Sequence, residues 1–535
     1  MEKTADVVIV GSGVAGAMSG ARLARAGLRV LILEAGPRVR RAQALEQFYR
    51  APVKFPESPY PNTPYAPHPG GDPGKYFLQD GPETFQSGYL RQVGGTTWHW
   101  LGTALRFLPE DFRLHSLYGA GVDWPLTYDD LEPWYYEAEK EMGVAGDPAY
   151  DLGSPRKQPY PMAAIQMSYL DQRMAAALAG IGYKVEPTPQ ARNSGVYQGR
   201  PPCCGSASCI PICPVQAKYD ATVHVREAER AGAELVEQAV VHFVETGADG
   251  LVSGVRYMRP DRSEHRASGK VYVIASHGIE SAKLLLQSRT EARPSGIANS
   301  SDQVGRNLMD HPTYLSWALA GEPVWPYRGP LSTAGVEFPR IGGDRGQRAA
   351  FRIQISGSWS WPKNTPYSTV DDLLERGLRG ADLDRALAER SSREFLLTGM
   401  CEQLPLPENR VVPDFAHRDA LGVPRLRITY RVDEYTRLGL EQARRVHRRI
   451  FAAMQCSEAY FGDDIHGSGH LIGTYRMGDN PRDSVVDANL RTHDHPNLFL
   501  LGSGVFPTST ASNPTLTIGA LALRAVEPIR QTARK

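Results

Sequence analysis

The sequence lacks the features that would place it in a membrane or on nucleic acid. No apolar run reaches the ~18 residues that a membrane-spanning helix needs. The formal net charge is only +1 over 535 residues, so no attraction to nucleic acid or to a charged membrane surface is indicated. Internal repeats and low-complexity tracts are also missing. We therefore expect a globular protein that is long enough for two or more domains with sizeable cores.

A secretion signal is also missing at the N-terminus. The first predicted strand begins at Asp6, which leaves no room for a charged segment, an apolar core and a cleavage site. Taken alone, this predicts a cytoplasmic protein.

Cysteine is scarce and unevenly distributed. Four of the six cysteines lie within eleven residues: Cys203, Cys204, Cys209 and Cys213. A disulfide framework would spread its cysteines along the chain, so this segment predicts a metal or cluster site instead. Cys401 and Cys456 are isolated and are predicted to be buried as small apolar residues.

The segment 6–36 has the order strand, glycine-rich turn, helix, strand. Val7–Val10 is a continuous apolar run, typical of a buried parallel strand. It is followed by a GxGxxG turn made of Gly11, Gly13 and Gly16. In such a turn the first glycine permits the tight bend, the second lets the backbone approach a pyrophosphate, and the third lets the helix pack closely on the strand.

The rest of this segment completes the pattern of a dinucleotide-binding unit. A helix predicted at Val14–Ala26 would direct its N-terminal amides at the phosphates. Glu34 ends the second strand, Val30–Leu33, at the position where a ribose hydroxyl would lie. Because strand, helix and acid all have the required spacing, the segment predicts dinucleotide binding. The alternative is a glycine-rich turn in an ordinary strand–helix–strand unit.

The remaining chain predicts further alternating elements. Residues 50–80 are rich in proline, tyrosine and glycine and are expected to be irregular. Thr127 is predicted to cap a helix that runs through Glu139. Further helices are predicted at Ala221–Ala231, Ala282–Ser288, Val370–Glu389 and Glu434–Met454. Further strands are predicted at Glu234–Thr246, Leu251–Tyr257, Lys270–Ala275, Ala349–Gly357, Glu394–Gln403 and Arg425–Tyr430.

Five stretches together resemble the glucose–methanol–choline (GMC) oxidoreductases, the flavin family that oxidises alcohols and sugars. They run from one end of the chain to the other: Gly11–Glu34, Val93–Trp100, Val304–Pro312, Gly469–Gly478 and Asn497–Arg524. The resemblance implies FAD rather than a nicotinamide. It also implies a mixed α/β fold, with a Rossmann-like FAD-binding domain and a discontinuous antiparallel-sheet substrate domain.

The two expected domains are each assembled from several segments. We predict that residues 1–46, 85–112, 202–312 and 462–535 form the FAD-binding domain, with a cysteine loop at 203–214. Residues 47–84, 113–201 and 313–461 are predicted to form the substrate domain and its excursions, with helices on the outer side of its sheet.

The resemblance assigns the chemistry to the C-terminal part of the chain. His470 opens a stretch that matches the family's HxxGxxxMG pattern, in which the histidine is the general base. A neutral imidazole with a pKa near the working pH is suited to accept the hydroxyl proton. Asn513 stands where the family places a second polar partner, and its amide could hydrogen-bond the developing alkoxide. The alternatives are a surface loop histidine and, for Asn513, a helix N-cap, which is compatible with the catalytic role.

Further cofactor contacts are implied by the same resemblance. Gly94 and Gly95 let the backbone approach a ligand closely, and His99 keeps the spacing of a histidine that some family members bond covalently to the flavin. A histidine merely packed on the flavin ring is equally consistent with this motif. Val241 and Asp487 resemble FAD-contacting positions. A helix predicted at Leu516–Ala525 would direct its positive N-terminal end at the flavin.

The cysteine loop narrows the resemblance to a group within the family. Cys204, Cys209 and Cys213 have CxxxxCxxxC spacing before a proline, which suits a 3Fe-4S cluster, whereas Cys203 as a fourth ligand would suit a 4Fe-4S cluster. Zinc is the alternative, although all-cysteine zinc sites usually use paired CxxC motifs. The loop resembles that of the catalytic subunits of bacterial membrane-linked FAD-dependent glucose dehydrogenases, in which three cysteines bind a 3Fe-4S cluster.

This group implies partners and a location that the sequence itself does not show. Its catalytic subunit travels with a small subunit that carries an export signal, and a multihaem cytochrome c subunit accepts the electrons. The implied location is the periplasmic face of the inner membrane, or the cytoplasm if no partner exists.

The implied activity is oxidation of an aldose, first of all glucose at its anomeric carbon to the lactone. Glu402 is predicted as a substrate contact. The alternatives are a dehydrogenase of gluconate, sorbitol or another polyol, an oxygen-using oxidase with a structural zinc, and a non-catalytic electron carrier.

The first prediction concerns the flavin. The purified protein should be yellow, and substrate should bleach its oxidised-flavin absorption spectrum, because the glycine-rich segment and the C-terminal motifs indicate FAD. A nicotinamide requirement, with no flavin released on denaturation, would contradict this. Acid precipitation tests His99 separately, because a covalently bound flavin stays with the pellet.

Overall fold

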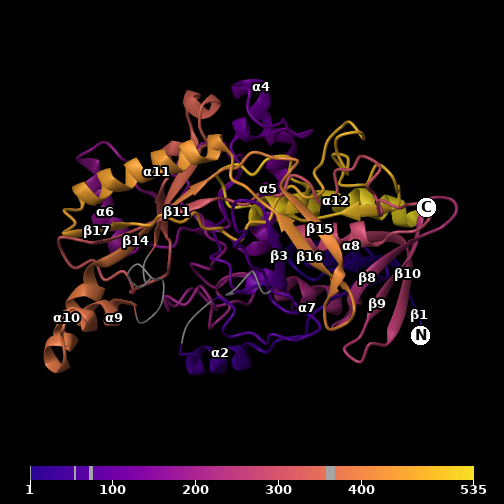
Figure 1. The fold of residues 1–535 in the computed structure, drawn as a ribbon, viewed down its shortest axis with the longest axis horizontal. Coiled ribbons are helices and arrows are strands. Elements are labelled where there is room, and N and C mark those ends of the chain that lie inside the picture. Colours follow the sequence, from indigo (N-terminus) through magenta and orange to yellow (C-terminus); the bar gives the residue numbers. More distant parts are fainter. Residues whose placement is uncertain (1, 53–55, 71–75, 357–367) are drawn as a thin grey trace.

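Two large sheets, each with its own hydrophobic core, organise the chain (Figure 1). The computed structural model describes the whole chain except residues 1, 53–55, 71–75 and 357–367. The mixed α/β fold predicted from the sequence is confirmed.

The first sheet contains the N-terminal dinucleotide unit. Its strand order is β7-β2-β1-β10-β9-β8, and β18 also pairs with β10. β1 pairs in parallel with β2 and β10, and β10 pairs in parallel with β18, whereas β9 is antiparallel to both its neighbours. The strands are β1 (Glu2–Val10), β2 (Val30–Leu33), β7 (Glu234–Val236), β8 (Val240–Thr246), β9 (Val252–Met258), β10 (Glu264–Ile274) and β18 (Leu498–Leu500).

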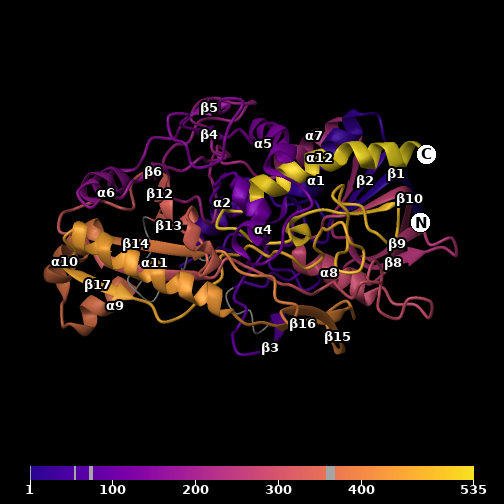
Figure 2. The same ribbon diagram turned by 90° about the horizontal axis from the view of Figure 1, so that it is seen from above.

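Helices from both ends of the chain cover this sheet (Figure 2). α1 (Val14–Arg25) packs against α7 (Thr222–Arg230) and α12 (Thr515–Arg534), and α12 also packs against α5 (Tyr128–Met142). The apolar run of β1 is buried, with Val7, Val8 and Ile9 fully inaccessible to solvent. α8 (Gly278–Gln287) contacts β8 and β15 (Arg410–Arg418).

The second sheet is antiparallel throughout its order β17-β11-β14-β13-β12-β6. α11 (Glu434–Ala453) lies along it and packs on β11, β13 and β14. The Asp433 carboxylate caps this helix by accepting from Thr436 N at 2.8 Å. The strands are β6 (Glu186–Pro187), β11 (Thr313–Leu319), β12 (Ala334–Val336), β13 (Phe351–Ser356), β14 (Glu394–Cys401) and β17 (Glu458–Phe461).

The other elements are short or peripheral. β15, β16 (Pro424–Thr429) and β3 (Phe77–Asp80) form a three-stranded sheet, and β4 (Ala145–Gly146) pairs with β5 (Met162–Ala163). The remaining α-helices in the described part of the chain are α2 (Arg41–Arg50), α4 (Leu114–Tyr118), α6 (Tyr169–Ala179), α9 (Ser368–Glu375) and α10 (Gly380–Arg393). Short 3-10 turns lie at Gly95–Trp98, Pro109–Arg113, Phe338–Arg340, Gly343–Gly346 and Ser503–Val505.

Three predicted elements differ from the structure. The helix predicted at Val370–Glu389 is two helices, α9 and α10, because Gly377 between them and Gly380 at the start of α10 adopt positive φ. The strand predicted at Glu234–Thr246 is broken at Gln238, where φ is +54°, and β7 and β8 lie at opposite edges of the sheet. Arg425–Tyr430 was predicted within the substrate sheet, but β16 pairs with β15 and, in parallel, with β3.

Several other predictions hold closely. Thr127 caps α5, since its hydroxyl accepts from Asp130 N while the Asp130 carboxylate accepts from Thr127 N at 2.8 Å. The helix expected to begin at Leu516 is α12, which extends nine residues beyond the predicted end at Ala525. The predicted strand end at Gly357 lies outside the described residues. Among the described helices, none combines the length and apolarity that crossing a bilayer requires.

Candidate active site

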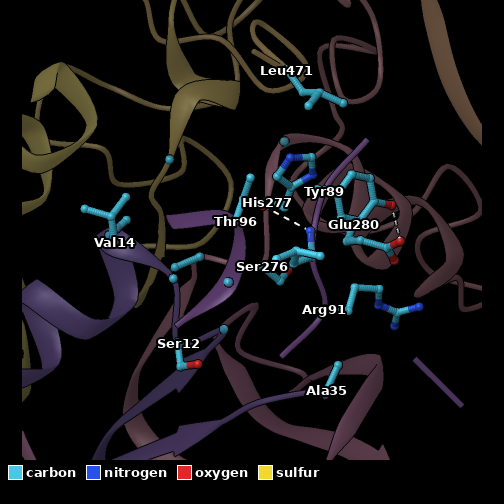
Figure 3. A pocket seen from close by; sticks show the side chains of 18 of the residues that line it. Ser12, Val14, Ala35, Tyr89, Arg91, Thr96, Ser276, His277, Glu280 and Leu471 are labelled. Atoms are coloured by element: carbon cyan, nitrogen blue, oxygen red, sulfur yellow. Dashed lines mark hydrogen bonds between the residues drawn. The ribbon is translucent and has the colours of Figure 1, made fainter. Parts of the chain in front are cut away.

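One cavity lies at the carboxyl ends of the central parallel strands (Figure 3). β1, β2 and β10 end at this edge, and the residues just beyond them line the cavity, among them Gly11, Glu34 and Ser276. Open α/β sheets bind their ligands in this position. We call it the dinucleotide cavity.

The three glycines of the GxGxxG turn have different steric roles. A Cβ at Gly11, where φ is +99°, would lie 2.6 Å from the carbonyl oxygen of Ala275. A Cβ at Gly16 would lie 2.1 Å from the carbonyl oxygen of Gly11. At Gly13 a Cβ would meet nothing within 4 Å, and Gly13 lines the cavity. Gly11 and Gly16 are therefore required by packing, whereas Gly13 keeps space open for a ligand.

Glu34 is buried and held by Ser12. Its carboxylate accepts from Ser12 N at 2.9 Å, from Ser12 Oγ at 2.7 Å and from Gly36 N at 3.0 Å. Burial raises the pKa of Glu34, and these hydrogen bonds oppose the rise. Ser12 Oγ also accepts from Gly94 N at 3.1 Å. Ser12 thus connects the glycine-rich turn to Glu34 and to the Gly94-Gly95 pair. No sequence motif indicated this role.

The other predicted cofactor positions are only partly brought together. Gly95 and Val241 line the dinucleotide cavity. Asp487 is not among the described residues that line it. Asp487 Oδ1 accepts from Asn489 N at 2.8 Å and from Arg491 N at 3.1 Å, so this side chain closes a local turn.

A second cavity, of about 440 Å³, lies between the two large sheets, and we call it the interdomain cavity. Five residues line both cavities: Thr96, Trp100, Gly469, His470 and Thr515. The walls contributed by the antiparallel sheet carry hydroxyl and amide groups on Thr313, Gln354, Ser356 and Thr398. The two cavities therefore meet at the predicted base.

His470 is paired with a second histidine from the segment before β11. The Nδ1 atoms of His470 and His311 are 2.9 Å apart, so one ring donates and the other accepts. Burial, the neighbouring His311 and the Arg352 charge hold the pKa of His470 well below its usual range. Burial lowers the pKa of His311 to about 4. Both rings are therefore neutral near pH 7, and His470 is free to take a proton.

Asp310 fixes the two histidines relative to one another. Its Oδ1 accepts from His311 N at 2.6 Å, from His470 N at 3.0 Å and from Ser468 N at 3.3 Å, and its Oδ2 accepts from Ser87 Oγ. Burial raises the pKa of Asp310 to about 6. Potential ligand atoms of Asp310, His311 and His470 lie close enough to share a metal ion. The Asp310 oxygens and the Nδ1 atoms of the two rings already take part in hydrogen bonds within this group, which holds the predicted base His470 next to His311.

Asn513 lies in the interdomain cavity with His470. The interpretation of Asn513 as a helix N-cap is wrong, because α12 is preceded by Pro514 and has no side-chain cap. Asn513 Oδ1 instead accepts from Arg352 Nη1 of β13 at 3.3 Å.

His99 faces the interdomain cavity, and its Nε2 is buried without a partner among the described residues. Burial, with a further contribution from the charge of Lys218, lowers the pKa of His99 to about 3. The ring is therefore an uncharged group beside Trp100, which lines both cavities.

Glu402, predicted as a substrate contact, is not among the described residues that line the interdomain cavity. Its carboxylate accepts from Arg345 Nη2 at 2.7 Å, from Tyr435 OH at 2.7 Å and from Ala350 N at 2.8 Å. Arg345 Nη2 also lies 2.9 Å from Asp111 Oδ1. Asp111, Arg345 and Glu402 are each at most 3% exposed, so they form a buried ion network that occupies Glu402.

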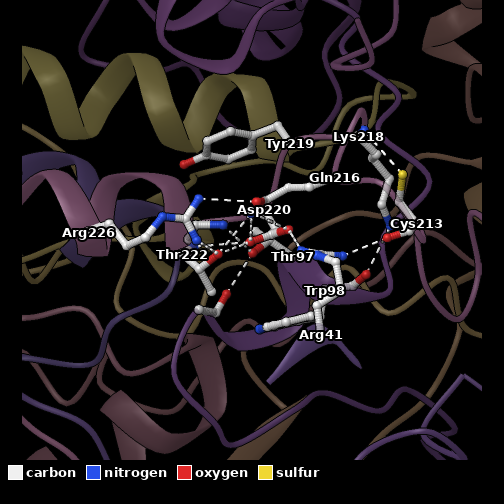
Figure 4. Close-up of polar contacts among 12 residues, drawn as sticks. Arg41, Thr97, Trp98, Cys213, Gln216, Lys218, Tyr219, Asp220, Thr222 and Arg226 are labelled. Carbon is white, nitrogen blue, oxygen red and sulfur yellow. Dashed lines mark hydrogen bonds and ion pairs between the residues drawn. The ribbon is translucent and has the colours of Figure 1, made fainter. Parts of the chain in front are cut away.

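The cysteine loop packs on the segment that leads away from Gly94 and Gly95 (Figure 4). Lys218 Nζ donates to the carbonyl oxygens of Trp98 at 3.0 Å and Cys209 at 2.8 Å, and also to that of Trp100. Lys218 N donates to Cys213 Sγ at 3.5 Å. Burial lowers the pKa of Lys218 to about 8, although the nearby Cys209 and Cys213 oppose this.

The four cysteines differ in exposure. Cys209 and Cys213 are buried, Cys203 is half-buried and Cys204 is exposed. In the described part of the chain no three cysteine sulfur atoms lie within 4.8 Å of one another, as ligands of one zinc ion would. The iron–sulfur cluster stays a prediction for this loop.

Sequence reasoning missed Arg352, Asp310 and His311 as parts of the site. Asp310 and His311 lie in the quoted stretch Val304–Pro312, where a carboxylate next to a histidine is a usable signal. Arg352 lies on an ordinary strand, and nothing in its local sequence marks it.

Comparison with known proteins decides the family. The N-terminal GMC oxidoreductase family model matches residues 6–313, and the C-terminal model matches residues 405–522. The chain belongs to the GMC oxidoreductase family. It is therefore a flavoprotein oxidoreductase that uses FAD and acts on sugar or alcohol donors.

Individual members of the GMC family show how far the similarity extends. The chain is 40% identical to the large subunit of fructose dehydrogenase from Gluconobacter japonicus over 538 residues, which cover 98% of each chain. It is 30% identical to 2-methyl-1,2-propanediol dehydrogenase from Mycolicibacterium austroafricanum, covering 97% of this chain and 94% of that one. A solved formate oxidase from Aspergillus oryzae shares the fold, with a TM-score of 0.68 at 14% identity over 99% of this chain and 98% of that one.

The steric roles of the glycines generate the second prediction. Gly13→Ala should leave a folded chain with less bound FAD, because the new methyl group enters the dinucleotide cavity without striking protein atoms. The flavin-to-protein absorbance ratio and the thermal unfolding midpoint are measured together. Gly195→Ala is the matched control, because its Cβ also meets nothing within 4 Å but Gly195 is exposed. Full FAD content in Gly13→Ala would contradict the assignment.

Proposed function

We propose that this chain is the FAD-carrying large subunit of a sugar dehydrogenase, which oxidises a sugar by hydride transfer to the flavin and passes the electrons through an iron–sulfur cluster to a cytochrome c subunit. The observation that carries this proposal is the meeting of the two cavities at His470, with hydroxyl and amide side chains on the wall opposite. Such a wall suits a polyhydroxylated substrate, because each buried polar group needs a hydrogen-bonding partner.

Each residue of the site has a separate task. His470 takes the hydroxyl proton through Nε2 when its Nδ1 donates to His311. Asp310 holds the backbone of both histidines, and Asn513 contacts the substrate oxygen. FAD, when bound, supplies the hydride acceptor, and Gly11, Gly13, Gly16, Glu34, Gly95 and Val241 would hold it.

We propose that the substrate is a sugar, and glucose and fructose are the two sugars to test first. The sequence resemblance favours glucose, oxidised at its anomeric carbon. The 40% identity to a fructose dehydrogenase large subunit over nearly the full length favours fructose as the second candidate. Gluconate and sorbitol remain alternatives with the same arrangement of motifs.

The cluster, the partners and the location are proposed together. Cys204, Cys209 and Cys213 would bind a 3Fe-4S cluster, with Cys203 as a possible fourth ligand of a 4Fe-4S cluster. A one-electron relay is needed because a flavin receives two electrons while a haem accepts one at a time. A small export-signal-bearing subunit and a multihaem cytochrome c subunit would place the complex on the periplasmic face of the inner membrane.

The third prediction tests the reaction itself. A dye-linked assay is run on glucose, fructose, gluconate and sorbitol, with and without oxygen, and we expect a sugar to be oxidised without an oxygen requirement. His470→Ala should lose ~10²–10⁴ in kcat while keeping FAD, because the general base is gone. His417→Ala is the control, because His417 is an exposed histidine and its loss should leave kcat unchanged. Oxygen-dependent turnover would favour an oxidase, and an unimpaired His470→Ala would end the base assignment.

The fourth prediction tests the relay. Cys204→Ser, Cys209→Ser or Cys213→Ser should lose iron, and transfer to an electrode or cytochrome should fall more than dye-linked turnover, because a small dye reaches the flavin directly. Cys203→Ser should have a mild effect on iron content and electron transfer if the cluster has three ligands, and a severe effect if it has four. Electron paramagnetic resonance decides the same question, since an oxidised 3Fe-4S centre is paramagnetic and an oxidised ferredoxin-type 4Fe-4S centre is silent. Unchanged iron content in all variants would make the loop structural.

A further inference from the structure

Arg352 is a buried cation beside the candidate active site, and no sequence motif marks it. Its side chain is fully inaccessible to solvent. It donates from Nη2 to Glu337 Oε1 at 2.6 Å, from Nη2 to Thr188 Oγ1 at 3.2 Å and from Nη1 to Asn513 Oδ1 at 3.3 Å. Arg352 belongs to β13, whereas Asn513 lies just before α12. This contact therefore joins the antiparallel sheet to the C-terminal segment of the site.

The chemistry of the two groups fixes which way the amide points. A guanidinium can only donate hydrogen bonds, whereas an asparagine amide has one accepting oxygen and one donating nitrogen. The atom of Asn513 that faces Arg352 must therefore be Oδ1. The NH₂ group is then turned away from Arg352, and Asn513 lines the interdomain cavity with His470.

We propose that Arg352 is a positioning residue, which locks the Asn513 amide so that it only donates to the substrate oxygen and leaves His470 as the sole proton acceptor. This inference rests on the proposed function and adds a residue to it. A freely rotating amide would present its oxygen to the substrate hydroxyl part of the time and accept the hydrogen bond that has to point at His470 for proton transfer. With the oxygen bound to Arg352, the amide can stabilise negative charge as it develops on the substrate.

The surroundings of Arg352 suit this task. Glu337 is 3% exposed and pairs with both Arg352 and Arg340, whose guanidinium nitrogens lie 2.6 Å and 3.4 Å from its carboxylate. Arg340 Nη2 in turn donates to Ser512 Oγ at 2.7 Å. Two arginines on one carboxylate thus hold the consecutive residues 512 and 513, so the position of the amide is determined by a rigid network.

The positive charge of Arg352 also acts on His470. The other titratable side chains that contact His470 or line the interdomain cavity with it are Asp310, His311, Glu57, His99 and His466. The dinucleotide cavity, which His470 also lines, adds Glu34, Tyr89, Arg91, His277 and Glu280. After burial and His311, Arg352 contributes to the low pKa of His470. Removing this cation should raise the pKa of His470, so the base would become protonated at a higher pH than in the unmodified enzyme.

A mutant cycle in the FAD-loaded enzyme tests the proposal. Asn513→Ala should lower kcat for the best sugar by about 10²–10³, as loss of one such donor typically does. Arg352→Met should also lower kcat with little change in KM, and Arg352→Lys should restore part of it. At a pH above the acid limb, where His470 is neutral in every variant, the double variant should be no slower than Asn513→Ala, because Arg352 then acts through Asn513. Multiplicative losses, or an Arg352→Met enzyme with normal kcat, would overturn the proposal.

The pH profile and two further variants distinguish a positioning role of Arg352 from a role in folding stability alone. The acid limb of kcat/KM should move to higher pH in Arg352→Met but not in Arg340→Met, which removes the other partner of Glu337. If Arg352→Met does not load FAD, the double variant Arg352→Met, Glu337→Gln is tested instead. It removes the negative charge of Glu337 together with the arginine that lies closest to it, so that this charge is not left buried without that partner. An unmoved limb in the loaded variant would contradict the inference. If the unmodified enzyme oxidises no sugar, the proposed function fails instead.

Discussion

The parallel pairing of β10 with β1 and β18 is the constraint on which the rest of the structure depends. These strands come from the beginning, the middle and the end of the chain, yet their carboxyl ends meet at one edge of one sheet. The segments that follow them line the dinucleotide cavity. The register therefore brings the glycine-rich turn, α8 and the C-terminal segment to the same place. No local interaction could do this, because the pairing strands are more than two hundred residues apart.

Burial determines the pKa values of the titratable side chains around His470. The pKa of His470 and of His311 is lowered because an uncharged ring is favoured away from water, whereas the pKa of Asp310 is raised for the same reason. A buried carboxylate persists beside them because four hydrogen bonds converge on it. The antiparallel sheet adds Arg352, so the electrostatic environment of the base is set jointly by both large sheets.

The sequence predicted the parts whose pattern is local. Gly11–Glu34 was identified because its spacing alone describes a strand, a turn, a helix and an acid, and Thr127 was identified as a cap because its partner Asp130 is three residues away. Two failures were local, since residues with positive φ split the helix predicted at Val370–Glu389 and the strand predicted at Glu234–Thr246. The others involve distant partners. The contact of Asn513 with Arg352 could not be predicted, because the two residues are 161 positions apart and the pairing leaves no local pattern. β16 was assigned to the wrong sheet because its pairing with β3 joins segments about 350 residues apart. Glu402 could not be distinguished from a cavity residue until Arg345 and Tyr435 were seen around it.

The buried network of Asp111, Arg345 and Glu402 has a consequence for recombining members of this family. Arg345 and Glu402 belong to the segment 313–461, whereas Asp111 belongs to 85–112, so the ion network crosses a predicted domain boundary. A chimera that imports 313–461 from a relative without an arginine at the position of Arg345 would leave Asp111 buried without its partner, at a cost of about 3–5 kcal/mol. Residues 313–461 therefore have to be exchanged together with Asp111 if this buried network is to stay intact.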